Sequence, residues 1–429
     1  MKYLIWLLSL LVFSPTVWAQ QTPAPPQSRA IAIVGATAHL GNGEVIENSF
    51  IAFEDGKLTI VADGRLVKPD RNKNYQIIQA TGKHAYPGLI APNSQLGLIE
   101  IGAVSATRDA DEVGLLNPNV RSIIAYNTDS RVTPTVRSNG VLLAQIVPQG
   151  GRISGSSSVV ELDAWNWEDA AYRTDDGIHL NWPRAMTWTG WRTGSPYMKK
   201  NEKYTEQVKE IKAFLKEAKV YMDLASVEEK NLKFEAMQGL FDQSKTLFVH
   251  TNASKTIASA VLMAKEFGLK LVIVGGADSW LQTDLLRENN VAVILRPTQR
   301  LPGREDTDID QPFKTPSLLQ QERVLFAFGG GGSWQQRNLP FQAGQAVGFG
   351  LDYEKAIAAL TLNTAKILGI DKTVGSLEVG KDATLIVSEG DVLDMQTCKV
   401  EHAFIRGKAI DLDNKQKALY RKYKQKYSR

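Results

Sequence analysis

Two carboxamide side chains, Asn93 and Gln95, follow the apolar strand expected near residues 86–91. A neutral carboxamide oxygen is a far poorer ligand for zinc than an imidazole nitrogen. A site built on these two side chains would therefore not hold zinc as a pair of histidines does.

The sequence holds only five histidines, which limits any metal site built from imidazoles. Three of them fall in or beside β-rich segments near the two ends of the chain: His39, His84 and His402. Only His179 and His250 remain for the middle of the chain, so a site of four imidazoles cannot be assembled there. His250 ends the apolar run 246–250. Taken by itself, it is a polar residue at a strand end, bonded to water or backbone.

Other reactive residue types lack the patterns that their chemistry requires. The serine-rich run 154–158 and Ser333 have no G-x-S-x-G motif, so we expect polar loops rather than a nucleophile. Asp306, Asp308 and Asp310 alternate as calcium ligands do, but without the remaining loop pattern they indicate a solvated acidic loop.

The N-terminus has the pattern of an export signal. Lys2 precedes the apolar run 4–13, and Val17 and Ala19 suit the −3 and −1 positions of a cleavage site. We therefore expect a signal peptide over residues 1–19 and a periplasmic or secreted protein. Ten apolar residues are too few to cross a bilayer, so no membrane span is expected.

Composition narrows the remaining classes. A Pro-rich linker is expected at 20–29, and the single cysteine, Cys398, excludes an intramolecular disulfide. The formal charge of +4 gives no argument for a nucleic-acid partner, and none is expected. The basic tail 412–429 carries tyrosines at helical spacing, which favours a helix that docks its tyrosines on the small β-rich part of the protein. The alternative for this tail is a weak contact with an anionic surface.

The elements that must position the candidate residues fall into two groups. Short β-branched runs at 30–63 and again at 382–410 predict one small domain built from both ends of the chain. From residue 246 onward, apolar runs alternate with helical patterns, which is typical of parallel strands buried on both faces. We therefore predict an α/β fold, a (β/α)8 TIM-type barrel.

The barrel is expected to be inserted into a small split β-sandwich. Its boundaries are 86–374, and the composite sandwich takes 30–85 plus 375–411. Residues 201–245 read as outer amphipathic helices. Residues 98–200, with a Trp-rich stretch, read as long loops that cap the barrel mouth.

The first-strand segment resembles that of the amidohydrolase superfamily. The family pattern is P-G-h-I-D-x-H-x-H, with h apolar. Residues 87–90 match it, Ala91 stands in place of the Asp, and Asn93 and Gln95 stand in place of the two His.

The C-terminal segment 361–387 is similar to the family's closing motif, T-x-N-x-A-x-x-L-G followed by G-S-L-E-x-G-K-D-A-D. Only Thr384 departs, at a position where Asp is common. The resemblance covers roughly residues 30–410 and has the character of the imidazolonepropionase-like, exported branch.

The resemblance implies a divalent metal, usually zinc, at the carboxyl ends of the barrel strands. His250 matches the ligand of the fifth strand. Gly275 stands where the sixth-strand His would be, and the glycines 329–332 cover the position of the catalytic Asp. No counterpart of the fourth-strand lysine is found, since the lysines near 216–219 lie in a helical pattern.

The resulting prediction is a degenerate metal site with no bound cofactor. It is a pocket formed by residues of the former metal site, with His250 as the single candidate ligand: Asn93, Gln95, His250, Gly275 and Gly331.

The resemblance implies hydrolysis of non-peptide or dipeptide C–N bonds. Because the ligands are missing, three hypotheses stay open. First, the chain is a hydrolase with a rebuilt site. Second, it is a non-catalytic protein that binds a small molecule over its Trp-rich loops. Third, it is a structural protein that assembles with an active paralogue or with copies of itself.

Overall fold

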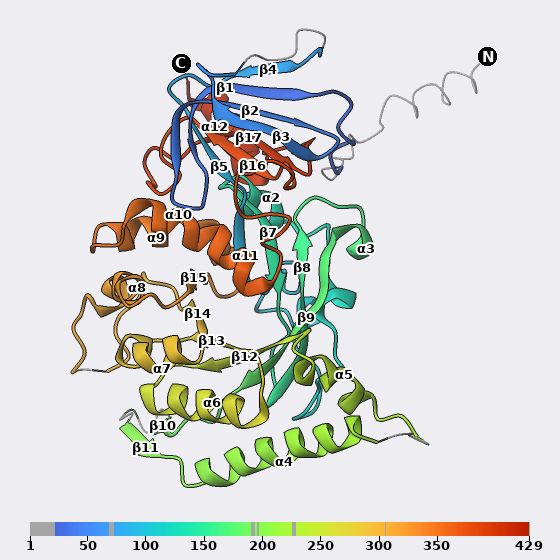
Figure 1. Ribbon diagram of the computed structural model, residues 1–429, viewed down its shortest axis with the longest axis vertical. Helices are drawn as coiled ribbons and strands as arrows, with labels where there is room; N and C mark the ends of the chain where they lie inside the picture. Colours follow the sequence, from blue (N-terminus) through green and yellow to red (C-terminus); the bar gives the residue numbers. More distant parts are fainter. Residues whose placement is uncertain are drawn as a thin grey trace, which may run out of the picture.

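The computed structural model describes residues 22–67, 73–189, 194, 197–224, 229–304 and 306–428. Within these ranges the chain forms two large sheets. In Figure 1 a sheet built from both ends of the chain lies at the top, and the strands and helices of the middle lie below it.

The first sheet combines strands from both ends of the chain, in the order β18-β17-β16-β5-β1-β2-β3, with β4 paired to β1. Its strands are β1 Ile31–His39, β2 Val45–Glu54, β3 Lys57–Asp63, β4 Gln76–Gln79, β5 His84–Pro87, β16 Leu385–Ser388, β17 Val400–Ile405 and β18 Lys408–Ala409. The join between the two ends is the antiparallel pair of β5 and β16. The prediction that these distant segments pair is confirmed, whereas the split sandwich and its boundaries stay predictions.

The second sheet is the barrel sheet, in the order β15-β14-β13-β12-β9-β8-β7-β6. Its strands are β6 Leu89–Ser94, β7 Val141–Ile146, β8 Ile153–Glu161, β9 Ala171–Asn181, β12 Thr246–Thr251, β13 Leu271–Gly275, β14 Ala292–Leu295 and β15 Phe326–Phe328. Their near-continuous apolar sequences are buried on both faces, which is the pattern of strands covered by helices.

The barrel departs from a regular (β/α)8 arrangement at its third strand. β8 runs antiparallel to both β7 and β9, whereas the other neighbouring pairs of this sheet are parallel. No long crossover is needed there, because antiparallel strands can follow one another through short connections.

Two sequence expectations for this region are wrong. Residues 98–200 are not mainly loops at the barrel mouth, because they supply β7, β8 and β9. The serine-rich run 154–158 is not a polar loop, because it lies within β8, all of whose residues are buried. Its hydroxyls are satisfied internally, as when Ser157 donates to Asp176 at 2.7 Å, which allows a polar strand to be buried.

The barrel sheet is nearly closed. Its edge strands β6 and β15 approach each other, and beyond them the Gln95 N–H donates to the Gly332 carbonyl at 3.1 Å. Helix α11 (Leu362–Leu368) contacts both edge strands and so covers the seam between them.

The remaining helices surround the barrel sheet, as Figure 1 shows. They are α2 Thr133–Arg137, α3 Trp167–Ala170, α4 Tyr204–Met222, α5 Leu232–Phe241, α6 Ser254–Phe267, α7 Thr283–Glu288, α8 Gln311–Gln321, α9 Leu339–Val347 and α10 Tyr353–Leu360. Helices α10 and α11 are separate because the backbone breaks at Thr361, which lies between them.

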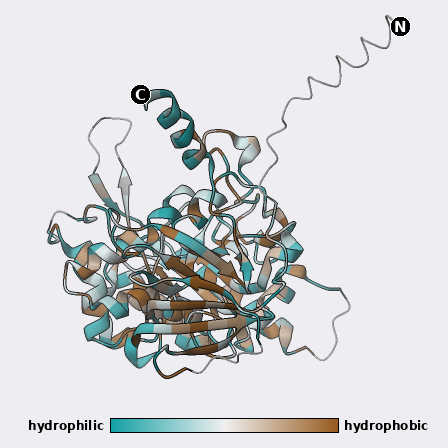
Figure 2. Ribbon diagram, turned by 90° about the horizontal axis from the view of Figure 1, so that it is seen from above, coloured by the Kyte–Doolittle hydropathy of each residue, from teal (hydrophilic) through white to brown (hydrophobic). Residues whose placement is uncertain are grey.

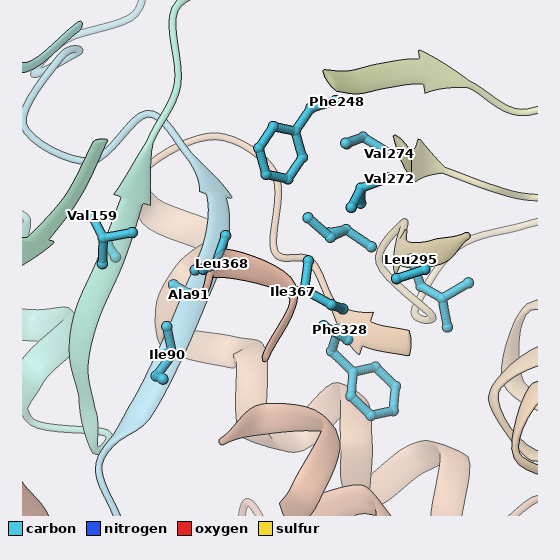
Figure 3. Close-up of a cluster of buried hydrophobic side chains, with 14 of the residues drawn as sticks. Ile90, Ala91, Val159, Phe248, Val272, Val274, Leu295, Phe328, Ile367 and Leu368 are labelled. Atoms are coloured by element: carbon cyan, nitrogen blue, oxygen red, sulfur yellow. The ribbon is translucent and has the colours of Figure 1, made fainter. Parts of the chain in front are cut away.

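Side chains from strands distant in sequence fill the barrel core. In Figure 3, Ile90 and Ala91 of β6 lie in the same cluster as Phe248 of β12, with Ile367 and Leu368 of α11 beside them. These residues are almost fully buried. The core therefore fixes the strand ends around which the site is built.

At the N-terminal end, the structure describes only part of the expected linker. The predicted signal peptide lies outside the described residues. The linker is anchored where it is described: the Ala24 N–H donates to Asp163 at 2.8 Å, and the Gln27 side chain bonds to Gly56 and Phe53.

The C-terminal helix α12 (Lys415–Tyr427) is not docked through its tyrosines. Tyr420, Tyr423 and Tyr427 are all exposed, and α12 has no buried residue. In Figure 2 it extends away from the body as a hydrophilic helix.

Candidate functional site

A cavity of about 1080 Å³ opens at the carboxyl ends of the barrel strands. Five barrel strands, β9, β12, β13, β14 and β15, each place one residue at or next to their carboxyl end in the cavity wall: Asn181, His250, Gly275, Leu295 and Gly329. The two-stranded hairpin β10 (Met186–Thr189) and β11 (Tyr197–Lys200) adds Met186 and Met198 to its wall. This is the end of a barrel where reactive or binding groups gather.

Four of the five residues predicted for the pocket line this cavity: Asn93, His250, Gly275 and Gly331. Gln95 does not line it. Asn93 takes a left-handed backbone conformation, with φ of 52°, and the chain then leaves the strand. The Gln95 backbone is held instead by Gly332.

Of the Trp-rich stretch, Trp182 lines the cavity. Trp165 lies exposed, and Trp167 packs against the core. Among the residues that the structure describes, the binding surface expected from the Trp-rich loops is therefore reduced to one tryptophan.

Gly275 at the end of β13 has no room for a side chain. A Cβ atom there would lie 2.7 Å from Asn252 Oδ1 and 2.9 Å from the Thr251 carbonyl oxygen. Its φ of 107° is also a conformation that side-chain-bearing residues rarely adopt. The sixth strand therefore cannot present a histidine without movement of the neighbouring strand end.

His179 and His250 face each other across neighbouring strands. The Nδ1 of His179 lies 2.8 Å from the Nε2 of His250, and the His179 ring stacks on Phe248. His179 is fully buried and its Nε2 has no partner among the described residues.

Both histidines of this pair are held neutral. Burial lowers the pKa of His250 to about 4. Burial, and then the neighbouring His250, holds the pKa of His179 far below its ordinary value.

A chain of hydrogen-bonded polar groups, which no sequence motif indicated, links β6, β7, β8 and β9. The Asn93 N–H donates to Gln145 Oε1 at 3.1 Å, and Gln145 Nε2 donates to Asp176 Oδ2 at 2.8 Å. Ser157 donates to the other oxygen of Asp176. Burial raises the pKa of Asp176 to about 6, although these hydrogen bonds oppose the shift.

The comparisons with known proteins agree with this architecture. Residues 336–410 match the model of the amidohydrolase family. Over this segment the chain is similar to the amidohydrolase family. No curated protein matches the sequence significantly.

Solved amidohydrolase structures share the fold over nearly the whole chain. An amidohydrolase from Thermotoga maritima MSB8 is 24% identical with a TM-score of 0.79, and the match covers 89% of this chain and 99% of that one. At these identities the likeness concerns the fold alone.

More distant matches come from related hydrolases. A putative prolidase from Bifidobacterium longum is 16% identical, covering 93% of this chain and 100% of that one, with a TM-score of 0.52. An adenosine deaminase from Xanthomonas campestris with bound zinc is also 16% identical, covering 94% and 98%, with a TM-score of 0.54.

The amidohydrolase family is generally metal-dependent, but the side chains at this barrel mouth do not fit a divalent ion. The two imidazoles use one nitrogen each to bond to one another. Asn93 and Gly275 supply no anionic or imidazole donor. Among the residues that the structure describes, no three His, Cys, Asp or Glu side chains are grouped to hold a metal.

No residue was predicted from the sequence to take the place of the family's fourth-strand lysine. The fourth strand is β9, and the polar residue that it places beside His250 is His179. The only local signal was the pair of apolar neighbours of this histidine, Ile178 and Leu180. It was hidden because the region was read as loops.

The remaining sequence candidates lie away from the cavity chemistry. His39, His84 and His402 lie on β1, β5 and β17 of the first sheet. Within the described ranges, no helix is long and apolar enough to span a bilayer.

The acidic loop forms surface ion pairs. Asp308 lies 2.6 Å from Lys314, and Asp306 lies 3.0 Å from Arg304. Both contacts are those of a solvated loop rather than of a calcium site.

Proposed function

We propose that this amidohydrolase-superfamily protein binds a small molecule at the barrel mouth and does not use the superfamily's divalent metal. The observation that supports this most directly is the contact between His179 and His250. A metal bound through these nitrogens would have to break their hydrogen bond. The crowded Gly275 offers no third donor on the next strand.

A second candidate is hydrolysis of a non-peptide or dipeptide C–N bond by a rebuilt site. His250 favours it, because this residue lines the cavity and its lowered pKa keeps the ring neutral near pH 7, as a general base must be. The resemblance to hydrolases in fold gives it further support.

Metal analysis of the purified full-length protein separates the two readings of the metal site. We expect zinc, manganese and iron each well below one equivalent, unchanged by His250→Ala or by the control His402→Ala. A metal near one equivalent that is lost in His250→Ala and kept in His402→Ala would refute the metal-free proposal.

Export and assembly complete the proposal. We propose a periplasmic or secreted protein, released from a leader over residues 1–19, that acts alone, as a homo-oligomer or with a paralogous amidohydrolase. Recovery from the native host as a monomer or homomer only, seen by gel filtration, would count against the paralogue.

A further inference from the structure

The cavity is strongly cationic. Among the described residues that line it, five side chains are basic and one is acidic: Arg184, Lys255, Arg296, Arg300 and Arg304 against Asp278. The one carboxylate is already engaged, because Asp278 Oδ2 lies 3.0 Å from Arg304 and accepts from the Ser254 N–H. The remaining positive charge therefore needs a counter-ion from outside the protein.

Arg296 and Arg300 lie where the chain leaves β14, the seventh barrel strand. Neither forms an ion pair with a described carboxylate. Arg300 donates from Nη1 to the Leu301 carbonyl at 3.2 Å, while its Nε is buried without an acceptor. A buried donor left unpaired is costly, so its position is explained best by an acceptor that a ligand brings.

The electrostatics of these two residues agree with that reading. Burial, followed by repulsion from Arg296, lowers the pKa of Arg300 to about 10. Partial desolvation, followed by the charge of Arg184, lowers the pKa of Arg296, although the residue as a whole is exposed. Arg296 thus experiences repulsion from Arg184 and exerts it on Arg300, and an anion bound between these groups would relieve that repulsion.

The cavity also contains an unpaired hydrogen-bond acceptor, the side-chain oxygen of Asn93. The Oδ1 of Asn93 is buried and has no donor among the described residues. Apolar side chains also line the cavity, among them Trp182, Val274 and Leu295. The cavity thus offers a cationic rim, apolar walls and a hydrogen-bond acceptor at the floor.

From these features we infer that the cavity takes a small organic carboxylate, whose carboxylate meets Arg296 and Arg300 and whose N–H donates to Asn93. This inference deepens the proposed function and rests on it. Guanidinium forks match planar carboxylates through paired hydrogen bonds. The volume suits a molecule of metabolite size.

Calorimetric titration of the full-length protein tests the inference with matched probes. The acids are N-acetyl-leucine and N-acetyl-glutamate, the neutral matches are their amides, and inorganic phosphate represents an anion without an N–H. We expect at least one acid to bind saturably, about tenfold or more tightly than its amide and than phosphate.

Variants place the binding in the cavity. Arg300→Gln and Arg296→Gln should each weaken binding of the acid about tenfold and bring it close to that of the amide. Asn93→Gly, which keeps the left-handed backbone, should weaken the acid and the amide alike. Arg287→Gln, at an exposed pair on α7, is the control and should change nothing. Melting temperatures within a few degrees of the parent establish that each variant is folded.

Several outcomes would overturn the inference. These are no saturable binding of either acid, equal affinity for acid and amide, phosphate binding as tightly as the acids, or unchanged acid binding in folded Arg300→Gln. Metal content measured on the same samples distinguishes failure of the proposed function from failure of this inference. A full equivalent of bound metal would contradict the proposed function. Metal-free protein that binds the acids no more tightly than their amides would contradict this inference alone.

Discussion

A single side-chain amide connects Asn93 on the cavity floor to the buried carboxyl of Asp176. Gln145 accepts from the Asn93 N–H and donates to Asp176, so its orientation is fixed from both ends. One side chain thereby connects the left-handed backbone at Asn93 to the carboxyl group of Asp176.

Asp176 should make stability depend on pH in mildly acidic solution. Its folded pKa, about 6, lies above the ordinary 3.8, so the folded state binds the proton more tightly. The stability that Asp176 contributes is present near pH 4 and is lost as the pH rises through 6. Relative to Asp176→Asn, the parent should lose up to about 3 kcal/mol between about pH 4 and pH 7.

Urea unfolding of the parent and the variant over that range measures this difference. The comparison with the variant is needed because His250 has the opposite pH dependence. Since its pKa is lowered to about 4 in the folded state, the stability that it contributes is present above pH 6.5 and is lost as the pH falls toward 4. Asp175→Asn is the matched control, because Asp175 is partly exposed beside Arg121. A parent-minus-variant difference that stays flat with pH would contradict the buried, protonated Asp176.

Gly275→Ala should destabilise the protein by more than its backbone conformation explains. The added Cβ would lie within 2.9 Å of two atoms of the β12 end. Gly268→Ala is the control, since Gly268 ends α6 with φ of 69° and has nothing within 4 Å of a Cβ. We expect about 1 kcal/mol for Gly268→Ala and about 3 kcal/mol or more for Gly275→Ala. Equal losses in chemical denaturation would mean that crowding at Gly275 is absent.

Arg137→Leu should be strongly destabilising. Arg137 on α2 pairs with Asp163 in a contact that is about 5% exposed on both sides, and it also donates to the Leu162 carbonyl. Removing the cation leaves a buried carboxylate without its charge partner, at about 3–5 kcal/mol. Arg287→Leu breaks an exposed pair and should cost less than about 1 kcal/mol. Similar melting temperatures for the two variants would contradict this assignment.

Most of α12 should be dispensable for folding. Deleting residues 418–429 removes no buried side chain among those described, up to residue 428, and should change the unfolding free energy by about 0.5 kcal/mol or less. Deletion from 413 onward should cost about 1–2 kcal/mol, because Asn414 donates to Ser138 and Gln416 accepts from Thr135. A large loss already in the shorter deletion would show that the tyrosines pack against the body.

From residue 246 onward, the sequence predicted the strands that are continuous apolar runs, whereas β7, also an apolar run, was missed within the region expected to form loops. β12, β13, β14 and β15 lie where the alternation of apolar and helical patterns indicated them. β8 was not predicted because its buried serines form hydrogen bonds with groups distant in sequence, such as Asp176. Hydropathy alone cannot reveal a strand of that kind.

The site was predictable only where a motif fixed the strand end. Asn93, His250, Gly275 and Gly331 lie together because each terminates or follows a barrel strand. Gln95 failed because the positive φ of Asn93 ends the alternation of the strand. Asp176, and the partnerless Nε of Arg300, depend on contacts between segments far apart in sequence, so no local pattern announces them.

The pairing of β5 with β16 has a consequence for synthesis on the ribosome. β5 ends at Pro87, and its partner does not begin until Leu385. The backbone groups on one edge of β5 therefore stay without their hydrogen-bond partners while the whole intervening barrel is translated. The last strands to emerge seal that edge, so a nascent chain interrupted before Leu385 would display an open template for aggregation.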